Sequence, residues 1–422
     1  MTNMKKILSV TAAAAMLLGV SACGSSNNGG TAAKSTQAIK LTVWGPSEDQ
    51  AKSDSWLPTM EKQFEKAHPE YKITWKNAVV SEGDAGTTVK QDPSAAADVY
   101  MFSNDQLGTL IDAQAIGEVS DDAKAQIKKQ DDEAVIKSVT GTDGKIYGVP
   151  FTGNTYFMFY NKSKFSSDDI KSLDTMLQKG KVSFNLGNSW YLPAFYTGAG
   201  MTLFGKDGAT AKDGVKMDSA AATDVTKYLV DLVKNPNFVV DNDEGAGLAA
   251  LQNGTVDAIF SGTWSASDVK KALGDNYAAA QLPSFTTSGG ETYQMKAFYG
   301  SKAVAYNPNS KAPQAAAEFA TYLGSTEAQK AHYTMRQIVP TDKSLASTYK
   351  NDPAAVAQND TIANTSILQP TITAMGNFWD PCKTFGTAIV NGDVTSDNAQ
   401  AKVQAWIDGY KNIASTSSSS SK

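Results

Sequence analysis

A chain of 422 residues is too long for one small core, and at about 150 residues per domain it predicts two or three domains. The net charge of -5 leaves no basic surplus to neutralise phosphates, which argues against nucleic acid as a partner. Only two histidines are present, His68 and His332, so metal sites and catalytic mechanisms that depend on histidine are poorly supplied.

The N-terminus has the pattern of an export signal. Lys5 and Lys6 form a positive region, and residues 7–20 form an apolar stretch too short to span a bilayer as a helix. A small-residue cleavage site follows and ends in Cys23. Residues 1–22 therefore resemble a bacterial lipoprotein signal, in which Cys23 carries the lipid. The alternative is an ordinary secretory signal with an incidental cysteine.

Residues 23–38 are rich in Gly, Ser and Asn, which predicts a flexible tether before a folded body that begins near Ala38. With Cys23 in the anchor, Cys382 is the remaining cysteine, so we expect no internal disulfide. Cys382 is expected to be a buried or half-buried small residue.

The first part of the body alternates strands and helices. Residues 39–44 alternate as a strand, residues 55–68 carry apolar side chains at helical spacing, and residues 71–75 form a second strand. A strand, helix and strand of these lengths predict an α/β lobe. Residues 98–102 add a buried strand, and residues 105–113 a helix.

Residues 144–162 predict two extended segments joined at residues 152–154. A segment this rich in apolar residues predicts a crossing between two lobes. Ligand-binding residues should gather around that crossing. We expect Phe151, Phe157 and Phe159 to lie in the lobe cores.

The rest of the chain again alternates helices and strands, which predicts a second α/β lobe. The expected helices cover residues 167–180, 220–234, 248–252, 312–323 and 399–413, and the expected strand covers residues 256–260. Residues 185–200 are dense in aromatic residues and have loop-forming residues at both ends.

Two glycine-containing segments match nucleotide-binding patterns only loosely. Residues 200–207 place Asp207 where a hydroxyl would hold magnesium, and residues 245–250 follow an acidic run instead of an apolar strand. The acidic run, residues 241–244, also lacks the spacing of a calcium-binding loop. We interpret these segments as turns and a helix start, and expect no cofactor and no metal.

A secreted glycoside hydrolase is the alternative of another class, because sugar cleavage needs only two carboxylates a few ångströms apart. Asp98, Asp105, Asp257 and Asp380 are candidates, but the sequence alone cannot place two of them across one bond. The chain has no GxSxG elbow. We therefore expect a protein that is not an enzyme and has no catalytic residues.

Aromatic residues recur beside Gly, Asn, Ser and Asp at strand ends and in loops. They are Trp44, Phe102, Trp190, Tyr191, Trp264, Phe378 and Trp379. Each alone is explained by core packing, but a sugar presents apolar C–H faces and a rim of hydroxyls. Flat aromatic platforms edged by polar side chains suit such a ligand, so the pattern predicts a carbohydrate site.

In these segments the chain resembles the extracellular solute-binding proteins of carbohydrate ABC transporters, specifically the maltose and maltodextrin-binding group. Six segments carry the resemblance, in order: LTVWGPSE, ADVYMFSNDQ, GKIYGVPFTGNTYFMFYNK, NLGNSWYLPAFYTGAG, SGTWSASDVK and ILQPTITAMGNFWDPCKTFGTAIV. The resemblance implies a type II periplasmic-binding-protein-like fold, with two lobes, each a β-sheet flanked by helices, joined by hinge segments.

The two lobes are then expected to be discontinuous in sequence. Lobe 1 would combine residues 39–151 with about 296–345, and lobe 2 would combine residues 152–295 with about 346–414. A disordered tail would follow at residues 415–422, where serine dominates.

The resemblance also assigns ligand-binding residues position by position. The aromatic platforms fall on Trp190 or Tyr191, Trp264 and Trp379. The hydroxyl-binding positions fall on Ser47, Glu48, Asp98, Asp105 and Asn154. Asn188 and Lys383, at or near positions where the family has charged residues, are included as ligand-binding residues. We add Trp44 and Phe102 from their strand ends.

Departures from the family pattern reduce the number of charged contacts. The family has acidic residues at or near Asn154 and Asn188, a basic residue near Gln106, and an arginine where Lys383 stands. Maltodextrin is the expected ligand, and another oligosaccharide, fructan or plant-derived, remains open. Neutral amides can still serve sugar hydroxyls.

We therefore expect a monomeric lipoprotein held outside the cell membrane through Cys23. Its expected partners are the oligosaccharide and the permease subunits of an ABC importer. Within the crossing, Asn154 is expected to contact the sugar at the mouth of the cleft.

Overall fold

The computed structural model describes residues 36–92, 96–242 and 245–419. The expected signal peptide and Cys23 lie outside these ranges. Among the helices of the described ranges, none has both the length and the apolar character needed to cross a membrane.

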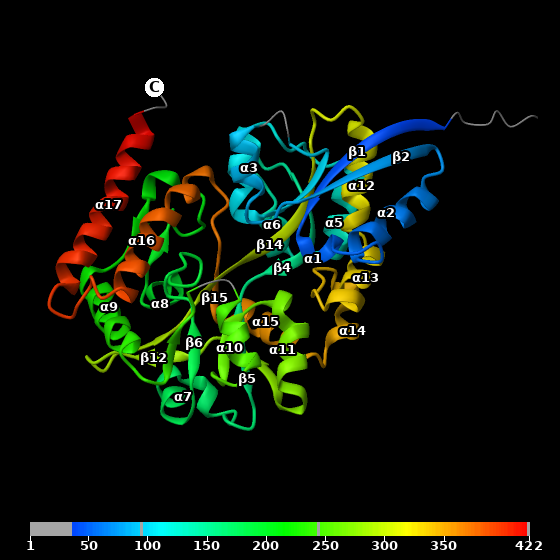
Figure 1. The fold of residues 1–422 in the computed structure, drawn as a ribbon. Coiled ribbons are helices and arrows are strands. Elements are labelled where there is room, and N and C mark those ends of the chain that lie inside the picture. The colour runs from blue at the N-terminus through cyan, green and yellow to red at the C-terminus, as the bar shows by residue number, and fades with distance from the viewer. Residues whose placement is uncertain (1–35, 93–95, 243–244, 420–422) are drawn as a thin grey trace, which may run out of the picture.

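Lobe 1 is built on a six-stranded sheet with helices on both faces (Figure 1). Its strands are β1 (Gln37–Gly45), β2 (Tyr71–Val79), β3 (Val99–Ser103), β4 (Val149–Asn154), β14 (Ala297–Tyr306) and β15 (Ser366–Leu368). β1 is parallel to β2 and β3, while β14 runs antiparallel to β3 and β4. Its helices are α1 (Ser47–Gln50), α2 (Trp56–Ala67), α3 (Ala85–Gln91), α4 (Leu107–Asp112), α5 (Asp121–Gln130), α6 (Glu133–Ser138), α12 (Pro313–Leu323), α13 (Thr326–Arg336) and α14 (Ala346–Tyr349).

Strand β3 shows why this lobe has a core on each face of its sheet. Successive side chains of a strand point to opposite faces. Tyr100 and Phe102 pack into one core with α3, α4 and α5, while Val99 and Met101 pack into the other with α2 and α12. A central strand covered on both faces must be apolar throughout, and all five residues of β3 are buried.

Lobe 2 is built on a five-stranded sheet in the order β11-β5-β10-β6-β9. These strands are β5 (Phe157–Asn161), β6 (Val182–Phe184), β9 (Phe238–Val240), β10 (Ala258–Ser261) and β11 (Tyr277–Ala280). Two small strand pairs are β7 (Thr202–Leu203) with β8 (Val215–Lys216), and β12 (Ser284–Thr286) with β13 (Thr292–Gln294). The helices are α7 (Leu173–Lys179), α8 (Pro193–Gly198), α9 (Ser219–Val233), α10 (Ala246–Gln252), α11 (Ala266–Leu273), α15 (Pro353–Asn364), α16 (Trp379–Val390) and α17 (Ala399–Ser419).

The chain passes between the lobes along extended segments. β4 leads directly into β5, and β14 runs from one lobe into the other (Figure 1). The first residues of β14 pair with β15, and its later residues pair with β3 and β4. A further crossing lies between α14 and α15, because α15 packs on β5 and β11 of lobe 2. The residue boundaries expected for the two lobes stay predictions.

Most elements expected from the sequence are present, with three differences. The joint expected at residues 152–154 is wrong, since β4 continues through Asn154 and the break falls at residues 155–156. Gly153 has no positive φ and pairs with Ser301 in the sheet, so it makes no turn. The aromatic segment also contains α8, which begins at Pro193, as a proline in the first helical turn allows.

The third difference is the C-terminal helix. α17 ends at Ser419 instead of residue 413, so residues 415–419, expected to be disordered, are helical. No Gly or Pro interrupts this serine run, which leaves the helix without a stop signal. The expected burial of Phe151, Phe157, Phe159 and Cys382 is confirmed.

Candidate functional site

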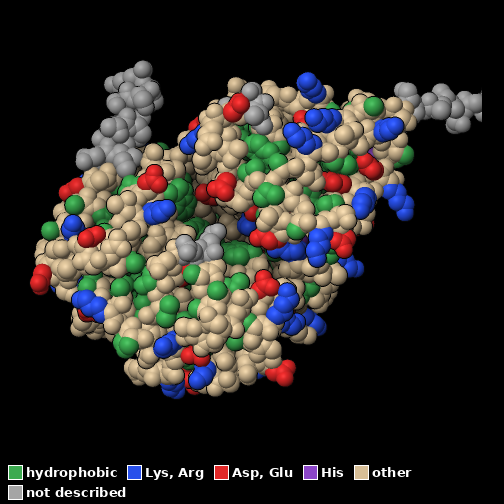
Figure 2. Space-filling view, viewed as in Figure 1, with side chains coloured by type: hydrophobic (Ala, Val, Ile, Leu, Met, Phe, Trp, Pro, Cys, Tyr) green, Lys and Arg blue, Asp and Glu red, His purple; other side chains and the backbone are tan. Residues whose placement is uncertain are grey.

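The two lobes face each other across a hollow with hydrophobic side chains inside it and charged side chains near its edge (Figure 2). On the lobe 2 side, Trp190 follows β6 and Trp264 follows β10. Because β6 and β10 are parallel neighbours, their carboxyl ends meet at one edge of the sheet. Ligands of α/β sheets bind at such edges.

The two tryptophans form an aromatic surface at that edge. Their ring centroids lie 5.9 Å apart with the planes tilted by 42°. Both side chains are half-buried, which leaves part of each ring open to a ligand. Tyr156 and Tyr191 make edge contacts with Trp190, with ring centroids 5.2 Å and 5.3 Å away, and so hold its ring in place. Tyr191 is 7% exposed, so of the two alternatives Trp190 is the better placed platform.

Trp379 and Lys383 come from the first turns of α16. Trp379 is half-buried and stands perpendicular to Phe298 on β14, with ring centroids 6.0 Å apart. Lys383 is exposed and lines a polar cavity of about 450 Å³ together with Asn188, Asp241 and Asn391. Asn188 also fixes the platform, because its Oδ1 accepts the backbone N–H of Trp190 at 2.8 Å.

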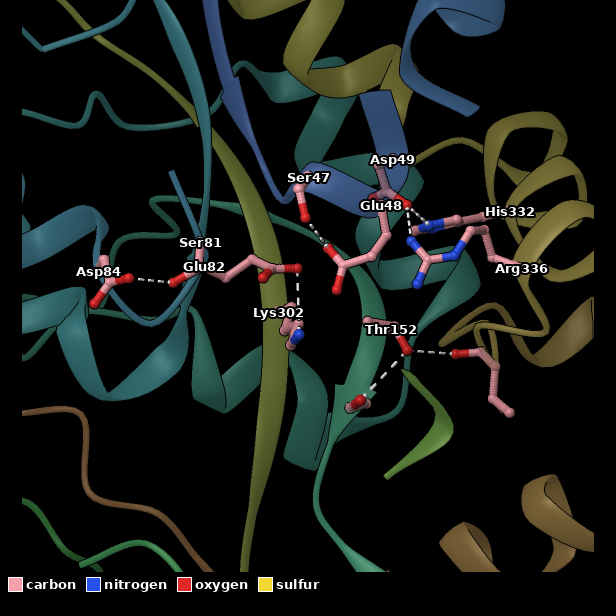
Figure 3. Close-up of polar contacts among 12 residues, drawn as sticks. Ser47, Glu48, Asp49, Ser81, Glu82, Asp84, Thr152, Lys302, His332 and Arg336 are labelled. Atoms are coloured by element: carbon pink, nitrogen blue, oxygen red, sulfur yellow. Dashed lines mark hydrogen bonds and ion pairs between the residues drawn. The ribbon is translucent and has the colours of Figure 1, made fainter. Parts of the chain in front are cut away.

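Lobe 1 contributes the turn that follows β1. Ser47 and Glu48 open the short helix α1 and are exposed, and the Ser47 hydroxyl donates to Glu48 Oε2 at 3.1 Å (Figure 3). The next residue, Asp49, is buried, and its Oδ1 lies 2.9 Å from His332 Nε2 and 2.6 Å from Arg336 Nη1. The turn is therefore anchored to α13 through Asp49 while its two preceding side chains stay free to meet a ligand.

Asp105 and Asn154 lie on neighbouring parts of lobe 1. Asp105 follows β3 in a 3-10 turn, Asn104–Gln106, and burial raises the pKa of its carboxyl to about 7. Asn154 ends β4 and pairs with Gly300 of β14. Gly300 is packed against the Asn104 side chain, which leaves no room there for a Cβ. Asp105 and Asn154 are thus brought to the same end of the sheet.

Three expected ligand-binding residues are placed elsewhere. Trp44 and Phe102 are buried in the core of lobe 1, where Trp44 packs on Tyr100 at 5.6 Å. The Asp98 carboxylate accepts hydrogen bonds from the backbone N–H and hydroxyl of Thr42 at 2.7 Å, and from the Ser310 hydroxyl at 2.6 Å.

The reason is positional. Asp98 precedes β3 and so lies at the opposite end of the strand from Asp105. We leave Trp44, Phe102 and Asp98 out of the site proposed below.

The structure brings three residues to the site that sequence reasoning missed. Lys302 on β14 lies with Nζ 3.2 Å from Glu82 Oε1 (Figure 3). The same Nζ lies 5.4 Å from the ring centroid of Trp264. Gln369 accepts from Trp190 Nε1 at 3.3 Å through its side chain, and from Asn104 Nδ2 at 3.4 Å through its backbone oxygen. Gln369 lies in one of the six segments that carry the family resemblance, so the sequence offered a signal for it. The sequence offered no such signal for Lys302, since its strand was not predicted.

A possible metal cluster lies at the other end of lobe 1. In the described part of the chain, His68, Glu70 and Glu318 form the one such group, with His68 Nδ1 at 3.1 Å from Glu70 Oε1 and 4.0 Å from Glu318 Oε2. His68 and Glu70 precede β2, and Glu318 lies on α12. The group is therefore at the amino end of β2, opposite the end of the parallel strands where Ser47 and Asp105 follow β1 and β3. We assign them to an ion-pair network and expect no metal in the site.

Comparison with known proteins identifies the family of this chain. Residues 59–358 match the sequence profile of the bacterial extracellular solute-binding protein family. The chain belongs to this family. Proteins of this family bind a solute outside the cell, and periplasmic binding proteins in general close two domains around their ligands by hinge motion.

Curated relatives extend over nearly the whole chain. The maltooligosaccharide ABC transporter solute-binding lipoprotein of Streptococcus pneumoniae is 29% identical over 414 residues, covering 92% of each chain. The galactooligosaccharide-binding protein of Bacillus subtilis is 26% identical, covering 93% of each.

Solved structures share the fold of this chain. One described as a complex with acarbose is 45% identical, with a TM-score of 0.85 over 88% of this chain and 98% of that one. The maltodextrin binding protein MalE1 from L. casei is 27% identical, with a TM-score of 0.76 over 89% and 98%. The expected two-lobed, type II periplasmic-binding-protein-like α/β fold is confirmed.

Proposed function

We propose that this solute-binding protein captures malto-oligosaccharides between its lobes and delivers them to the permease subunits of an ABC importer. The observation that carries the proposal is the Trp190–Trp264 surface of lobe 2, which lies beside Lys302 and Glu82 of lobe 1. Aromatic faces bury the C–H faces of a sugar, and the charged and amide groups around them serve its hydroxyls.

The choice of a malto-oligosaccharide rests on the relatives. Proteins named for maltooligosaccharide and maltodextrin binding cover the chain almost completely, and a structure 45% identical is described with acarbose. Asn154, Asn188 and Lys383 would act as polar contacts, with Trp379 and Trp190 as further platforms. Ser47, Glu48 and Asp105 would close the site from lobe 1. A ligand that touches both lobes binds the closed state better than the open one, so binding would favour closure.

The cellular setting follows from the N-terminus. Cys23 would carry the lipid that anchors a monomer to the outer face of the membrane, as the lipoprotein names of two relatives support. Replacing Cys23 with Ser should release the protein from the membrane fraction of its own cells. Retention of the variant in that fraction would contradict the anchor.

Calorimetry against a panel of sugars tests the ligand. We expect binding to maltotriose and longer maltodextrins, with galacto-oligosaccharides, diacetylchitobiose and fructo-oligosaccharides as the competing ligands. Binding confined to one of those competitors would overturn the malto-oligosaccharide assignment. Incubation with maltoheptaose addresses the hydrolase alternative, because shorter sugars released at a catalytic rate would contradict a pure binding function.

A further inference from the structure

Lys302 occupies an unusual place for a lysine. It lies on β14 between Ser103 of β3 and Thr152 of β4, in the interior of the lobe 1 sheet, and its side chain is 19% exposed. The neighbouring residues Ala303 and Val304 are fully buried. A lysine so enclosed loses hydration and needs partners for its ammonium.

The first partner is Glu82, which comes from the loop after β2. Its side chain is 9% exposed, and its Oε1 lies 3.2 Å from Lys302 Nζ. The backbone oxygen of Glu82 accepts the backbone N–H of Ser103 at 3.0 Å and the side-chain amide of Gln106 at 3.0 Å. The carboxylate is thus held by a fixed loop, so the pair is preorganised.

The second partner is Trp264 of lobe 2. The Lys302 ammonium lies 5.4 Å from the centroid of the Trp264 ring, within the roughly 6 Å range of a cation–π contact. One ammonium therefore touches a carboxylate of lobe 1 and an aromatic face of lobe 2. It is a direct link between the lobes inside the proposed site.

Stability alone does not account for this pair. A buried ion pair is often no more stabilising than apolar residues of the same volume, because both charges lose their hydration. A ligand site, in contrast, gains from a few fixed donors and acceptors among aromatic walls. A fixed ammonium and a fixed carboxylate side by side offer one donor and one acceptor to neighbouring groups of a polyhydroxylated ring.

We infer that Lys302 and Glu82 form a ligand-contacting pair that reads two adjacent hydroxyls of the sugar unit stacked on Trp264. The ammonium donates to one hydroxyl oxygen and the carboxylate accepts from the next hydroxyl. This inference rests on the proposed function, since it needs an oligosaccharide between the lobes. It assigns to the two residues a role in selecting the sugar, because a unit that lacks either hydroxyl leaves one buried charge without a partner.

The experiment measures maltotriose and maltopentaose affinity by calorimetry for wild type, Lys302→Met, Lys302→Arg, Glu82→Gln and Trp264→Ala. Lys302→Met and Glu82→Gln should each weaken binding by about ten- to a hundredfold, the loss of a hydrogen bond to a charged group. Lys302→Arg keeps the charge and should recover part of that loss. Lys216→Met is the matched control, because it breaks an exposed pair with Asp213 at 3.0 Å in lobe 2. Its affinity should equal that of wild type.

A double-mutant cycle separates contact from structure. If Lys302 and Trp264 act on the same sugar unit, the losses of Lys302→Met and Trp264→Ala should be less than multiplicative in the double variant. Melting temperatures of all unliganded variants are measured alongside. Glu82→Gln retains the size of the native side chain, and Lys302→Arg retains its charge. Wild-type affinity in both of these variants and in Lys302→Met, with binding lost only in Trp264→Ala, would overturn the inference while leaving the proposed function intact. Absence of sugar binding in wild type would overturn both.

Discussion

Arg336 Nη1 lies 2.6 Å from Asp49 Oδ1 and so joins α1 to α13 across 287 positions of sequence (Figure 3). His332 binds the same oxygen from the preceding turn of α13, and Trp56 stacks on its ring with centroids 4.0 Å apart. Beyond α13, the oxygen of Val339 accepts the hydroxyl of Thr152 on β4 at 2.7 Å. Asp49 thus connects the turn that presents Ser47 and Glu48 to α13, and the segment that follows α13 is bonded to the crossing strand β4.

The first prediction concerns this connection. Burial alone would raise the pKa of Asp49, but His332 and Arg336 hold it below its usual value. Asp49→Asn removes one member of a buried charge cluster and should lower the free energy of unfolding at pH 7 by about 3–5 kcal/mol. A carboxyl with a depressed pKa stabilises the folded state above its unfolded pKa of about 3.9 and loses that effect as the pH falls through the folded value.

The stability gap between wild type and Asp49→Asn should therefore narrow as the pH falls below about 4. Urea unfolding at pH 7 and at pH 3 measures it, with Asp54→Asn on an exposed position as the control. An equal gap at both pH values would contradict the role assigned to the ionised carboxylate.

The second prediction concerns a carboxyl whose pKa is raised by the fold instead of lowered. Glu61 on α2 is 6% exposed, and burial raises its pKa to about 7 despite a hydrogen bond from Asn77 Nδ2 at 2.7 Å. The folded state then binds the proton more tightly than the unfolded state, so this group costs stability as the pH rises from about 4 to 7. Glu61→Gln keeps the acceptor and removes the charge. It should be more stable than wild type at pH 8, by roughly 2 kcal/mol, and no different at pH 4.

Thermal unfolding at those two pH values checks this prediction. A variant less stable than wild type at pH 8 would show that the ionised carboxylate is better compensated than its burial implies. If Glu61→Gln differs from wild type in stability by the same amount at pH 4 and at pH 8, the effect comes from the amide group and not from ionisation of the carboxyl.

The sequence predicted the strand that precedes Trp264, but not the three-residue strand β6 that precedes Trp190. Trp190 and Trp264 each follow a strand of lobe 2, and parallel pairing of those strands brings them together. The family resemblance placed both Asp98 and Asp105 among the ligand-binding positions, although they flank β3 at opposite ends and the local pattern does not say which end reaches the site. Strand pairing decides it, since β3 is parallel to β1 and only Asp105 follows it at the end where Ser47 follows β1.

Lys302 and Glu82 could not be predicted for a related reason. β14 is buried on both faces for much of its length, so it lacks the alternation that marks a half-buried strand. Its lysine is explained only by partners more than 30 residues away in sequence, Trp264 in lobe 2 and Glu82 in lobe 1. Such contacts follow from the packing of two lobes, which no local motif encodes.

The third prediction tests the packing of β14 against the 3-10 turn that follows β3. A Cβ on Gly300 would overlap the side chain of Asn104, whose amide donates to the backbone oxygen of Gln369 at 3.4 Å. Gly300→Ala should lower stability by about 1–3 kcal/mol through overpacking and should weaken sugar binding as Gln369 shifts beside Trp190. Gly376→Ala is the matched control, because no atom lies within 4 Å of its added Cβ. Equal melting temperatures and affinities in the two variants would contradict the prediction.

The last prediction concerns the aromatic surface itself. Trp190→Ala and Trp264→Ala each remove one half-buried ring of the pair, and each should weaken maltodextrin binding by about 2–4 kcal/mol if the rings are buried anchors in the complex. Trp75→Phe in lobe 1 is the control. Trp75 is also half-buried, but it packs on Phe319 at 4.6 Å and donates to Glu65 at 2.9 Å.

Two measurements should then agree on the loss of binding: calorimetry with maltopentaose, and the change in intrinsic fluorescence when the sugar is added. Sugar stacking changes the surroundings of Trp190 and Trp264, so the fluorescence response to ligand should shrink in each alanine variant and persist in Trp75→Phe. Unchanged affinity in both alanine variants would remove the aromatic surface from the site and with it the observation on which carbohydrate binding rests. Loss in one variant alone would instead fix which ring the sugar covers.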